Sequence, residues 1–469
     1  MKKIFILLVS AIAFVGLGSA SAQSRNSYFM EGSYFRNDLN PALAPTRGYV
    51  ALPGISGFGL NVTNNFLSID NFIYQRDGQL VTALHDSVSS EEFFGKLPSE
   101  GKFAIDTKVN LFGVGFYAKK MFWTFGVNTN VSADMAMSMD MFKAIKTLGN
   151  GVYDLGNTAI EANAYMDAYL GTSFRVHDNV SIGVKVKFLM GIATLDAQFS
   201  ELKANVSPDV VTAEMNGAWR ANGIFLSNRG LTGNDFDLED AFITDPQTML
   251  NNIENYGLAF DLGAEVRLLD DQLKLSAAVT DLGFIKWRPN SHLSGGVTGD
   301  FSFAGVNIED PEMDALGSFE MSVNDKSENS GYKTSVNTSL NIGAEYNILN
   351  NHIAFGVLSH TKFCRTMTYS ELIASVNLRP TNWLSATVSH TFMNNNRPGI
   401  FGLALNIHPR VINIYAGLDF IDTKWINGPT IEGMQIPLPR YMKSVNAYIG
   451  IGFNFARPKF VRDAKKYEF

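Results

Sequence analysis

Charged residues recur at every second position in several extended stretches of the chain, with apolar residues between them. Lys185 and Lys187, for example, alternate with Val184, Val186 and Phe188. Successive side chains of a strand point to opposite faces, so such a stretch has one charged face and one apolar face. Charges on the inner face of a closed sheet either pair with each other or tune which solutes pass. The residues predicted to face such a lumen are Asp167, Arg175, Lys185, Lys187, Asp261, Glu265, Arg267, Glu345 and Asp419.

Hydrolytic chemistry has only weak candidates in the sequence. Ser359-His360 and Ser389-His390 come nearest, but adjacent residues of a strand face opposite sides, so neither serine is activated by its neighbour. Strand parity places His360 on the inner face and His390 on the outer one. The chain has no G-x-S-x-G, H-E-x-x-H or phosphate-binding loop motif and no metal-spaced Cys/His cluster. We therefore predict no enzyme, with no catalytic residue, cofactor or metal.

The alternating stretches fall into hairpins whose tight turns are rich in Asn, Asp, Pro and charge, as hairpin turns should be. A further strand is predicted at 55–63 and a closing strand at 444–455, so the total is about fourteen. The six predicted hairpins are 103–117 with 121–131, 160–176 with 180–199, 257–268 with 272–282, 333–347 with 352–364, 369–378 with 383–392, and 399–407 with 411–421.

Most connections between the hairpins are much longer than the turns within them. The long ones cover about 64–102, 132–159, 200–256, 283–332 and 422–443, and two short ones lie near 365–368 and 393–398. Short helices are predicted after Ser89, which opens a capping-box pattern, and around Phe142. A third, polar helix is predicted over Asp237 to Tyr256, interrupted at Pro246. Long loops at one end and tight turns at the other are typical of a bacterial outer-membrane barrel, with the loops outside.

The N-terminus reads as a secretory signal peptide. Lys2 and Lys3 precede an apolar run from Ile4 to Leu17, and Ala20-Ser21-Ala22 supplies the cleavage pattern. After this leader, no apolar run is long enough for a spanning helix, although 46% of the residues are hydrophobic. The net charge of −7 argues against nucleic acid as a partner. A single cysteine, Cys364, excludes an internal disulfide.

Strand parity also predicts which side chains face lipid. Val184, Val186, Ile342 and Leu418 are expected outside, whereas Gly343 is expected to face a hydrated lumen where an added Arg costs little. Aromatic residues near strand ends are expected to form interfacial girdles. They are Tyr117, Trp123, Tyr346, Trp383, Phe392, Phe420 and Phe455.

The stretch from Ser444 to Phe455 is similar to the C-terminal insertion signal of outer-membrane barrels, a glycine followed by the spaced aromatics Phe453 and Phe455. With the leader, Asn40-Pro41-Ala42 and about fourteen strands, the chain resembles the FadL-like (long-chain fatty-acid transporter) barrels. Asn40-Pro41-Ala42 and Leu52-Pro53-Gly54-Ile55-Ser56-Gly57 more closely resemble an uncharacterised outer-membrane family of Bacteroidetes-type bacteria. The resemblance implies that residues 23–46 plug the lumen. The transporters' path is largely apolar, so the charged lumen predicted here argues against a fatty-acid substrate.

We therefore expect an all-β protein: a transmembrane, up-and-down antiparallel β-barrel in the bacterial outer membrane, with short helices in long extracellular loops. The expected parts are a signal peptide (1–22), an N-terminal periplasmic or lumen-plugging segment (23–46), the barrel (47–456) and a basic periplasmic tail (457–469). The expected function is a passive channel or transporter for small solutes. The alternative is a non-conducting scaffold that partners a secretion system or surface complex. Other expected partners are outer-membrane lipid and the barrel-assembly machinery.

Overall fold

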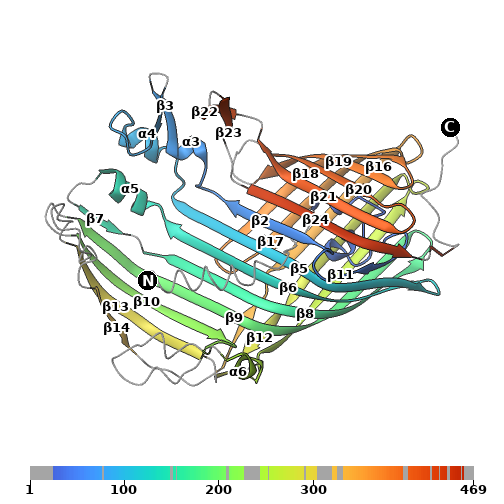
Figure 1. Ribbon diagram of the computed structural model, residues 1–469, viewed down its shortest axis with the longest axis horizontal. Helices are drawn as coiled ribbons and strands as arrows, with labels where there is room; N and C mark the ends of the chain where they lie inside the picture. Colours follow the sequence, from blue (N-terminus) through green and yellow to red (C-terminus); the bar gives the residue numbers. More distant parts are fainter. Residues whose placement is uncertain are drawn as a thin grey trace.

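The protein, seen in a computed structural model, is an antiparallel β-barrel with a few short helices (Figure 1). The described residues are 25–76, 79–147, 151–154, 156–206, 211–226, 243, 245–251, 253–289, 292–303, 319–324, 331–393, 400–422, 425–431, 434–440, 444–455 and 457–458. The predicted signal peptide and residues 459–469 of the predicted tail lie outside these ranges. Within them, no helix has the length and apolar character needed to cross a bilayer.

Fourteen strands close into a ring in which each strand pairs with its neighbours in antiparallel register. The predicted fold class is therefore confirmed. In order round the ring, the strands are β2 (Phe58–Asn64), β5 (Glu100–Ala118), β6 (Met121–Ser138), β8 (Thr158–His177), β9 (Val180–Val206), β11 (Tyr256–Leu268), β12 (Leu273–Trp287), β16 (Thr338–Ile348), β17 (Ile353–Phe363), β18 (Thr368–Thr381), β19 (Leu384–Met393), β20 (Ile400–Ile407), β21 (Ile412–Asp422) and β24 (Ser444–Phe455). Strand β24 closes the ring against β2.

The first wall strand is interrupted. Both β1 (Gly48–Ala51) and β2 pair with β24 on one side and β5 on the other, so together they act as one strand. The residues between them, 52–57, leave the sheet at Gly54, whose φ of 82° is a backbone conformation that glycine adopts without strain. The turn at residues 52–57, singled out in the sequence, therefore interrupts the first strand of the wall.

The two faces of the strands have the predicted chemistry. In β9, Lys185 and Lys187 are buried on the inner face, whereas Val186 is 43% exposed on the outer face. The prediction that Tyr117 belongs to an interfacial girdle is wrong: its side chain points inward from β5, and its hydroxyl donates to the Pro45 carbonyl at 2.6 Å. A bulge between Asn110 and Phe112 shifts the register of β5 and so reverses the face of every later residue. The side chain of Phe420, another predicted girdle residue, lies outside the described part.

The two ends of the barrel differ, and we call them the turn end and the loop end. At the turn end, tight hairpins use residues with left-handed φ angles, such as Asp270 (57°) and Asn350 (55°), which tolerate that conformation. At the loop end, most connections are long and carry most of the helices, although the one between β17 and β18 is a short turn. The predicted sorting of connections by length is confirmed.

The barrel sheet extends beyond the ring on one side of the loop end (Figure 1). The last part of β9 pairs with β10 (Val211–Gly223), β10 with β13 (His292–Phe303), and β13 with β14 (Phe319–Asn324). These strands lie within 200–256 and 283–332, which the sequence predicts to be connections. These strands are rich in glycine and small residues and lack the apolar alternation that marks a strand in a sequence. They are extended because they pair in succession from the long strand β9.

Short elements fill the remaining connections. They are α3 (Ile69–Phe72), β3 (Ile73–Arg76), β4 (Gln79–Thr82), α4 (Ser90–Phe94), α5 (Asp140–Thr147), β7 (Gly151–Asp154), α6 (Pro246–Asn251), β15 (Tyr332–Ser335), β22 (Trp425–Ile431) and β23 (Met434–Pro439). The predicted cap is present, because the Ser89 hydroxyl accepts from the Glu92 amide at 3.1 Å. Helix α6 begins at Pro246 instead of being interrupted there, since proline suits the first position of a helix. Residues 237–242, predicted to open that helix, lie outside the described part.

Candidate functional site

The lumen is occupied by the chain's own N-terminal segment, residues 25–47. It contains η1 (Arg25–Ser27) and α2 (Arg36–Leu39) and then joins β1. Its apolar side chains are buried against the wall: Tyr28, Phe29, Leu39 and Leu43 cluster with wall residues such as Leu358. This segment is the first component of the candidate site.

Opposite charges hold the segment at three levels of the barrel. Arg25 pairs with Glu371 of β18, and Glu31 with Lys274 of β12. Asp38 lies 2.9 Å from Lys185 Nζ and 3.4 Å from Lys108 Nζ. Breaking one side of a buried ion pair leaves an uncompensated charge, which is strongly destabilising. These pairs therefore oppose withdrawal of the segment.

The Asn40-Pro41-Ala42 motif fits against two wall glycines. The Asn40 side chain accepts from the Ala42 amide at 2.9 Å, which folds the motif into a compact turn. A Cβ built on Gly183 would lie 2.0 Å from the Pro41 carbonyl carbon, and one on Gly263 would lie 2.0 Å from Asn40 Oδ1. Only glycine allows the segment to approach the wall this closely.

Several of the nine predicted lumen residues form ion pairs within the wall. Lys187 contacts Asp261 at 2.8 Å and Asp281 at 2.6 Å. Glu345 pairs with Arg379 and also contacts Lys274 at 3.4 Å.

The remaining predicted residues show a different pattern. Asp419 accepts from Asn26 and Asn446, and Asp167 accepts from Asn128 and Asn130. Arg267 pairs with Glu265. Arg175 is exposed at the turn end of β8. Two of the nine, Lys185 and Asp419, make polar contacts with the described part of the N-terminal segment.

Several partners of these charges were missed by sequence reasoning. Glu371 and Lys274 are buried on the inner face and follow the parity of their strands, so the same alternation test would have found them. The predicted hairpin of 369–378 with 383–392 leaves Arg379 in the turn, yet β18 continues to Thr381. Its side chain donates to Glu345 and to the Phe29 carbonyl.

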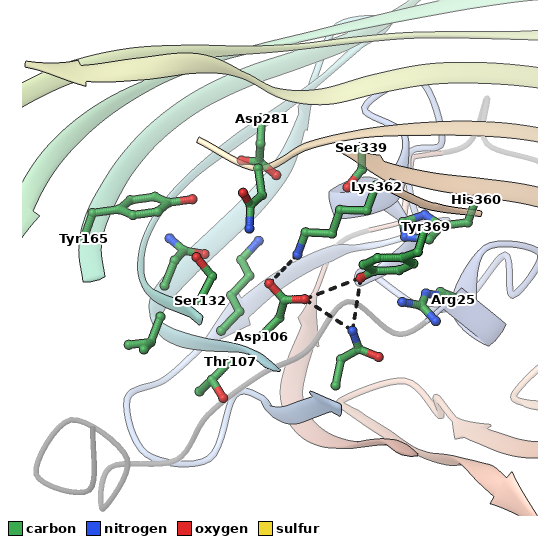
Figure 2. A pocket seen from close by; sticks show the side chains of 15 residues that line it. Arg25, Asp106, Thr107, Ser132, Tyr165, Asp281, Ser339, His360, Lys362 and Tyr369 are labelled. Atoms are coloured by element: carbon green, nitrogen blue, oxygen red, sulfur yellow. Dashed lines mark hydrogen bonds and ion pairs between the residues drawn. The ribbon is translucent and has the colours of Figure 1, made fainter. Parts of the chain in front are cut away.

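A polar pocket of about 60 Å³, room for a few waters, lies beside the N-terminal segment (Figure 2). Arg25 of the segment lines it together with wall residues from both sides of the lumen. Figure 2 shows Asp106 at its centre, bound by Lys362 at 2.5 Å and by Tyr369 at 3.4 Å. Asn61 donates to both Asp106 and Tyr369.

The two Ser-His pairs are divided between the faces of the barrel. His360 is buried and lines the pocket, with Nδ1 2.7 Å from Asn341 Oδ1. Because the Asn341 amide nitrogen donates to the Leu39 carbonyl, its oxygen accepts, so His360 donates to it from Nδ1. His390 lies on the outer face, packed edge-on against Phe392 and Phe401. In the described ranges, no three or more His, Cys, Asp or Glu residues are arranged to hold a metal ion.

Three titratable groups hold the segment in the lumen in their deprotonated forms: Glu31 and Asp38 of the segment, and His408 of the wall. Burial is the largest single influence on the pKa of Glu31 and would raise it, but the Lys274, Arg379 and Arg36 cations and the hydrogen bond from Lys274 together outweigh burial and lower that pKa. For Asp38, burial is likewise outweighed by Lys108, Lys185 and Lys187 acting together, so the pKa of Asp38 is also lowered.

His408, after β20, packs against the segment at the turn end. A Cβ on Gly32 would lie 2.1 Å from His408 Nε2, so the imidazole covers the segment's backbone directly. Burial disfavours the imidazolium, and with the nearby Arg47 charge it lowers the pKa of His408 to about 4.

Acid is therefore expected to release the N-terminal segment. Each of the three groups has a lower pKa when the segment is docked, so the stabilisation that these groups give to docking is greatest at neutral pH. This stabilisation falls below pH 6.5, the ordinary value for histidine, and falls further below 4.5, the ordinary value for Glu31. Hydrogen–deuterium exchange, corrected for the intrinsic rate, should show residues 25–44 losing protection by about tenfold or more between pH 7 and 4.5, while β17 keeps its protection. His408→Gln should move the start of this loss to lower pH. Protection of residues 25–44 that does not change with pH would contradict the prediction.

The fold and this site define a class: closed antiparallel β-barrels whose lumen is filled by their own N-terminal segment. The chain belongs to the family of unknown function DUF5723, whose profile matches residues 41–419. The predicted membership of an uncharacterised family is thereby confirmed. A search of curated proteins returns no match.

Solved structures with a related shape include three transporter barrels or their homologues. The P. putida toluene transporter TodX is 10% identical, with a TM-score of 0.39 covering 90% of this chain and 94% of that chain. A Pseudomonas aeruginosa FadL homologue is 9% identical, with a TM-score of 0.39 covering 93% and 97%. The Ralstonia pickettii toluene transporter TbuX is 9% identical, with a TM-score of 0.35 covering 93% and 96%. At these scores the likeness says nothing about what this chain binds.

Proposed function

We propose that the protein is a passive outer-membrane pathway for small polar solutes, held closed by its N-terminal segment. The observation that carries this proposal is the lumen itself. Charged and amide side chains line it, and the N-terminal segment of the same chain fills it and is held there by non-covalent contacts. A wall that needs no occupant would be expected to pair its charges within itself. Here Lys185 and Glu371 instead find partners on the segment.

The outer face of the ring supports a membrane location. Large apolar side chains are exposed on many barrel strands, a surface that a water-soluble monomer rarely presents. They include Leu170, Val186, Leu262, Ile342, Phe355, Leu372, Leu403, Leu418 and Ile449. Exposed Tyr346, Trp383 and Phe455 lie near strand ends, where interfacial aromatics belong. With the predicted leader, this favours the bacterial outer membrane, its lipid as a partner, and insertion through the barrel-assembly machinery by way of β24.

The pocket supports a polar cargo. Two of the structural neighbours are named as transporters of toluene, an apolar molecule. Here the pocket beside Arg25 is lined by Asp106, Lys362 and His360 together with amides and hydroxyls. An apolar solute would desolvate these groups without replacing their hydrogen bonds, which is costly.

Removing two charges from the segment should open the pathway. Glu31→Gln with Asp38→Asn keeps the side-chain shapes but leaves Lys274, Lys185 and Lys108 without their carboxylate partners on the segment. In planar bilayers we expect the parent to be closed for most of the time, and the double variant to have an open probability about tenfold higher or more. Asp86→Asn, an exposed change in a loop, is the matched control and should behave as the parent does.

The alternative is a non-conducting scaffold for a secretion or surface complex, favoured by the dense packing of residues such as Tyr28 and Leu39 in the lumen. It predicts no conductance from the double variant even when residues 25–44 have become accessible to protease. That combination of results would refute the pathway, whereas conductance from the double variant would refute the scaffold as the sole role.

A further inference from the structure

The connection between β17 and β18, Cys364–Met367, crosses the lumen at the loop end. Its backbone closes with a hydrogen bond from the Cys364 amide to the Met367 carbonyl at 2.9 Å. Thr366 then donates to Asp134 of β6 through both its amide, at 3.0 Å, and its hydroxyl. Strand β6 lies halfway round the ring from β18, so this contact joins opposite walls.

The turn is anchored by two further contacts. Arg365 Nη1 lies 2.6 Å from Asp196 Oδ2 on β9. Met367 is buried in a cluster with Ala104 of β5, and Cys364 packs against the same cluster. One step deeper, Lys362 of β17 reaches Asp106 of β5 at 2.5 Å, again across the ring.

The wall offers a reason for this crossing. Asp134, Glu161 and Asp196 lie directly opposite one another on β6, β8 and β9, and all three are buried. Like charges opposite each other on neighbouring strands destabilise a sheet. Arg365 reaches one end of this acidic row from the turn, and Thr366 donates to the other end. Arg220 of β10 also contacts Asp196, at 2.5 Å.

We propose that Cys364–Met367 is an outer latch, a second barrier that closes the pocket from the loop end. The pocket then lies between two closures, because Arg25 of the N-terminal segment lines it and so do Lys362 and Asp106, one layer below the latch. The latch rests on the proposed pathway for its purpose, and it adds that the pathway has two independently held barriers. Arg365 and Thr366 are its positioning residues, and solutes enter when they leave the acidic row.

The test measures entry into the pocket without requiring conduction. Ser339 is buried and lines the pocket, so Ser339→Cys in a Cys364→Ser background places one thiol there. Whole cells are treated with a small, impermeant, cationic methanethiosulfonate reagent. Arg365→Gln with Thr366→Val removes the guanidinium contact to Asp196 and the hydroxyl contact to Asp134, so that only the Thr366 amide still bonds the acidic row. This loosening should speed modification of the thiol by about tenfold or more. An exposed loop thiol, Asp86→Cys, should react at the same rate with or without the latch changes.

A second experiment fixes the latch closed instead of loosening it. It tests the proposal even if the loosened variant does not fold. Ala104→Cys with the natural Cys364 places two thiols in one cluster across the lumen, and a mild oxidant should join them. In that protein the thiol from Ser339→Cys should react several-fold more slowly when oxidised than when reduced. Equal rates in both arms, or failure of the two thiols to join, would overturn the latch.

The latch and the pathway fail in distinguishable ways. If loosening speeds labelling but the Glu31→Gln, Asp38→Asn protein never conducts, the latch stands and the proposed pathway falls. If that protein conducts but the rate of thiol labelling does not change with the latch variants, the pathway stands and the turn has only a structural role.

Discussion

Val186→Arg is expected to prevent the barrel from folding into lipid bilayers, whereas Lys185→Arg on the neighbouring residue is expected to fold. Val186 is on the apolar outer face, and an arginine near the bilayer midplane of a barrel costs about 2–4 kcal/mol. Lys185 is buried on the inner face, where its charge is already paired with Asp38. The two variants introduce the same side chain one residue apart, so they differ mainly in the face that receives it.

Folding can be followed by heat-modifiable gel mobility after dilution from urea into vesicles. The barrel interpretation requires a large loss of the fast-migrating form for Val186→Arg and a nearly normal yield for Lys185→Arg. If both variants fold equally well, the outer face of β9 does not contact lipid, and the proposed membrane location fails with it.

The ring of strands could be predicted because it rests on local signals. Alternation of apolar and polar residues set the face of each strand, and Asn and Asp at left-handed φ angles set the turns, as at Asp270 and Asn350. Tyr117 shows the limit of that method. The bulge at Asn110 and Phe112 inserts one residue, and nothing in the alternation of β5 marks where the register shifts.

The contents of the lumen could be predicted only in outline. Parity identified Lys185 and Asp419 as inward-facing, but their partners Asp38 and Asn26 are far away in the sequence. Position 343 shows the consequence. An added side chain at Gly343 was expected to meet water, yet a Cβ there would lie 2.6 Å from the Tyr28 ring, so an arginine cannot enter without displacing the segment. Long-range packing of this kind leaves no periodic trace.

The second large effect is expected from a single methyl group at Gly183. Its Cβ would lie 2.0 Å from the Pro41 carbonyl carbon and 2.2 Å from the Ala42 nitrogen, both backbone atoms of the N-terminal segment. A flexible side chain could move aside, but this backbone is fixed by Asn40 and by Ser173, which donates to the Ala42 carbonyl at 3.1 Å. Overpacking typically costs about 1–3 kcal/mol, and displacing the segment relieves it while the wall keeps its strand pairing.

Trypsin reports that displacement directly, since Arg36 is 6% exposed within the docked segment. Gly183→Ala should therefore allow cleavage after Arg36 in folded, purified protein, at a rate about tenfold or more above that of the parent. Gly113→Ala is the matched control, because Gly113 is an inward-facing wall glycine whose added Cβ would meet Ala51 at an ordinary 3.4 Å. The control should keep Arg36 protected. If Gly183→Ala protects Arg36 as well as Gly113→Ala does, close approach of Asn40-Pro41-Ala42 to the wall is not what holds the segment in the lumen.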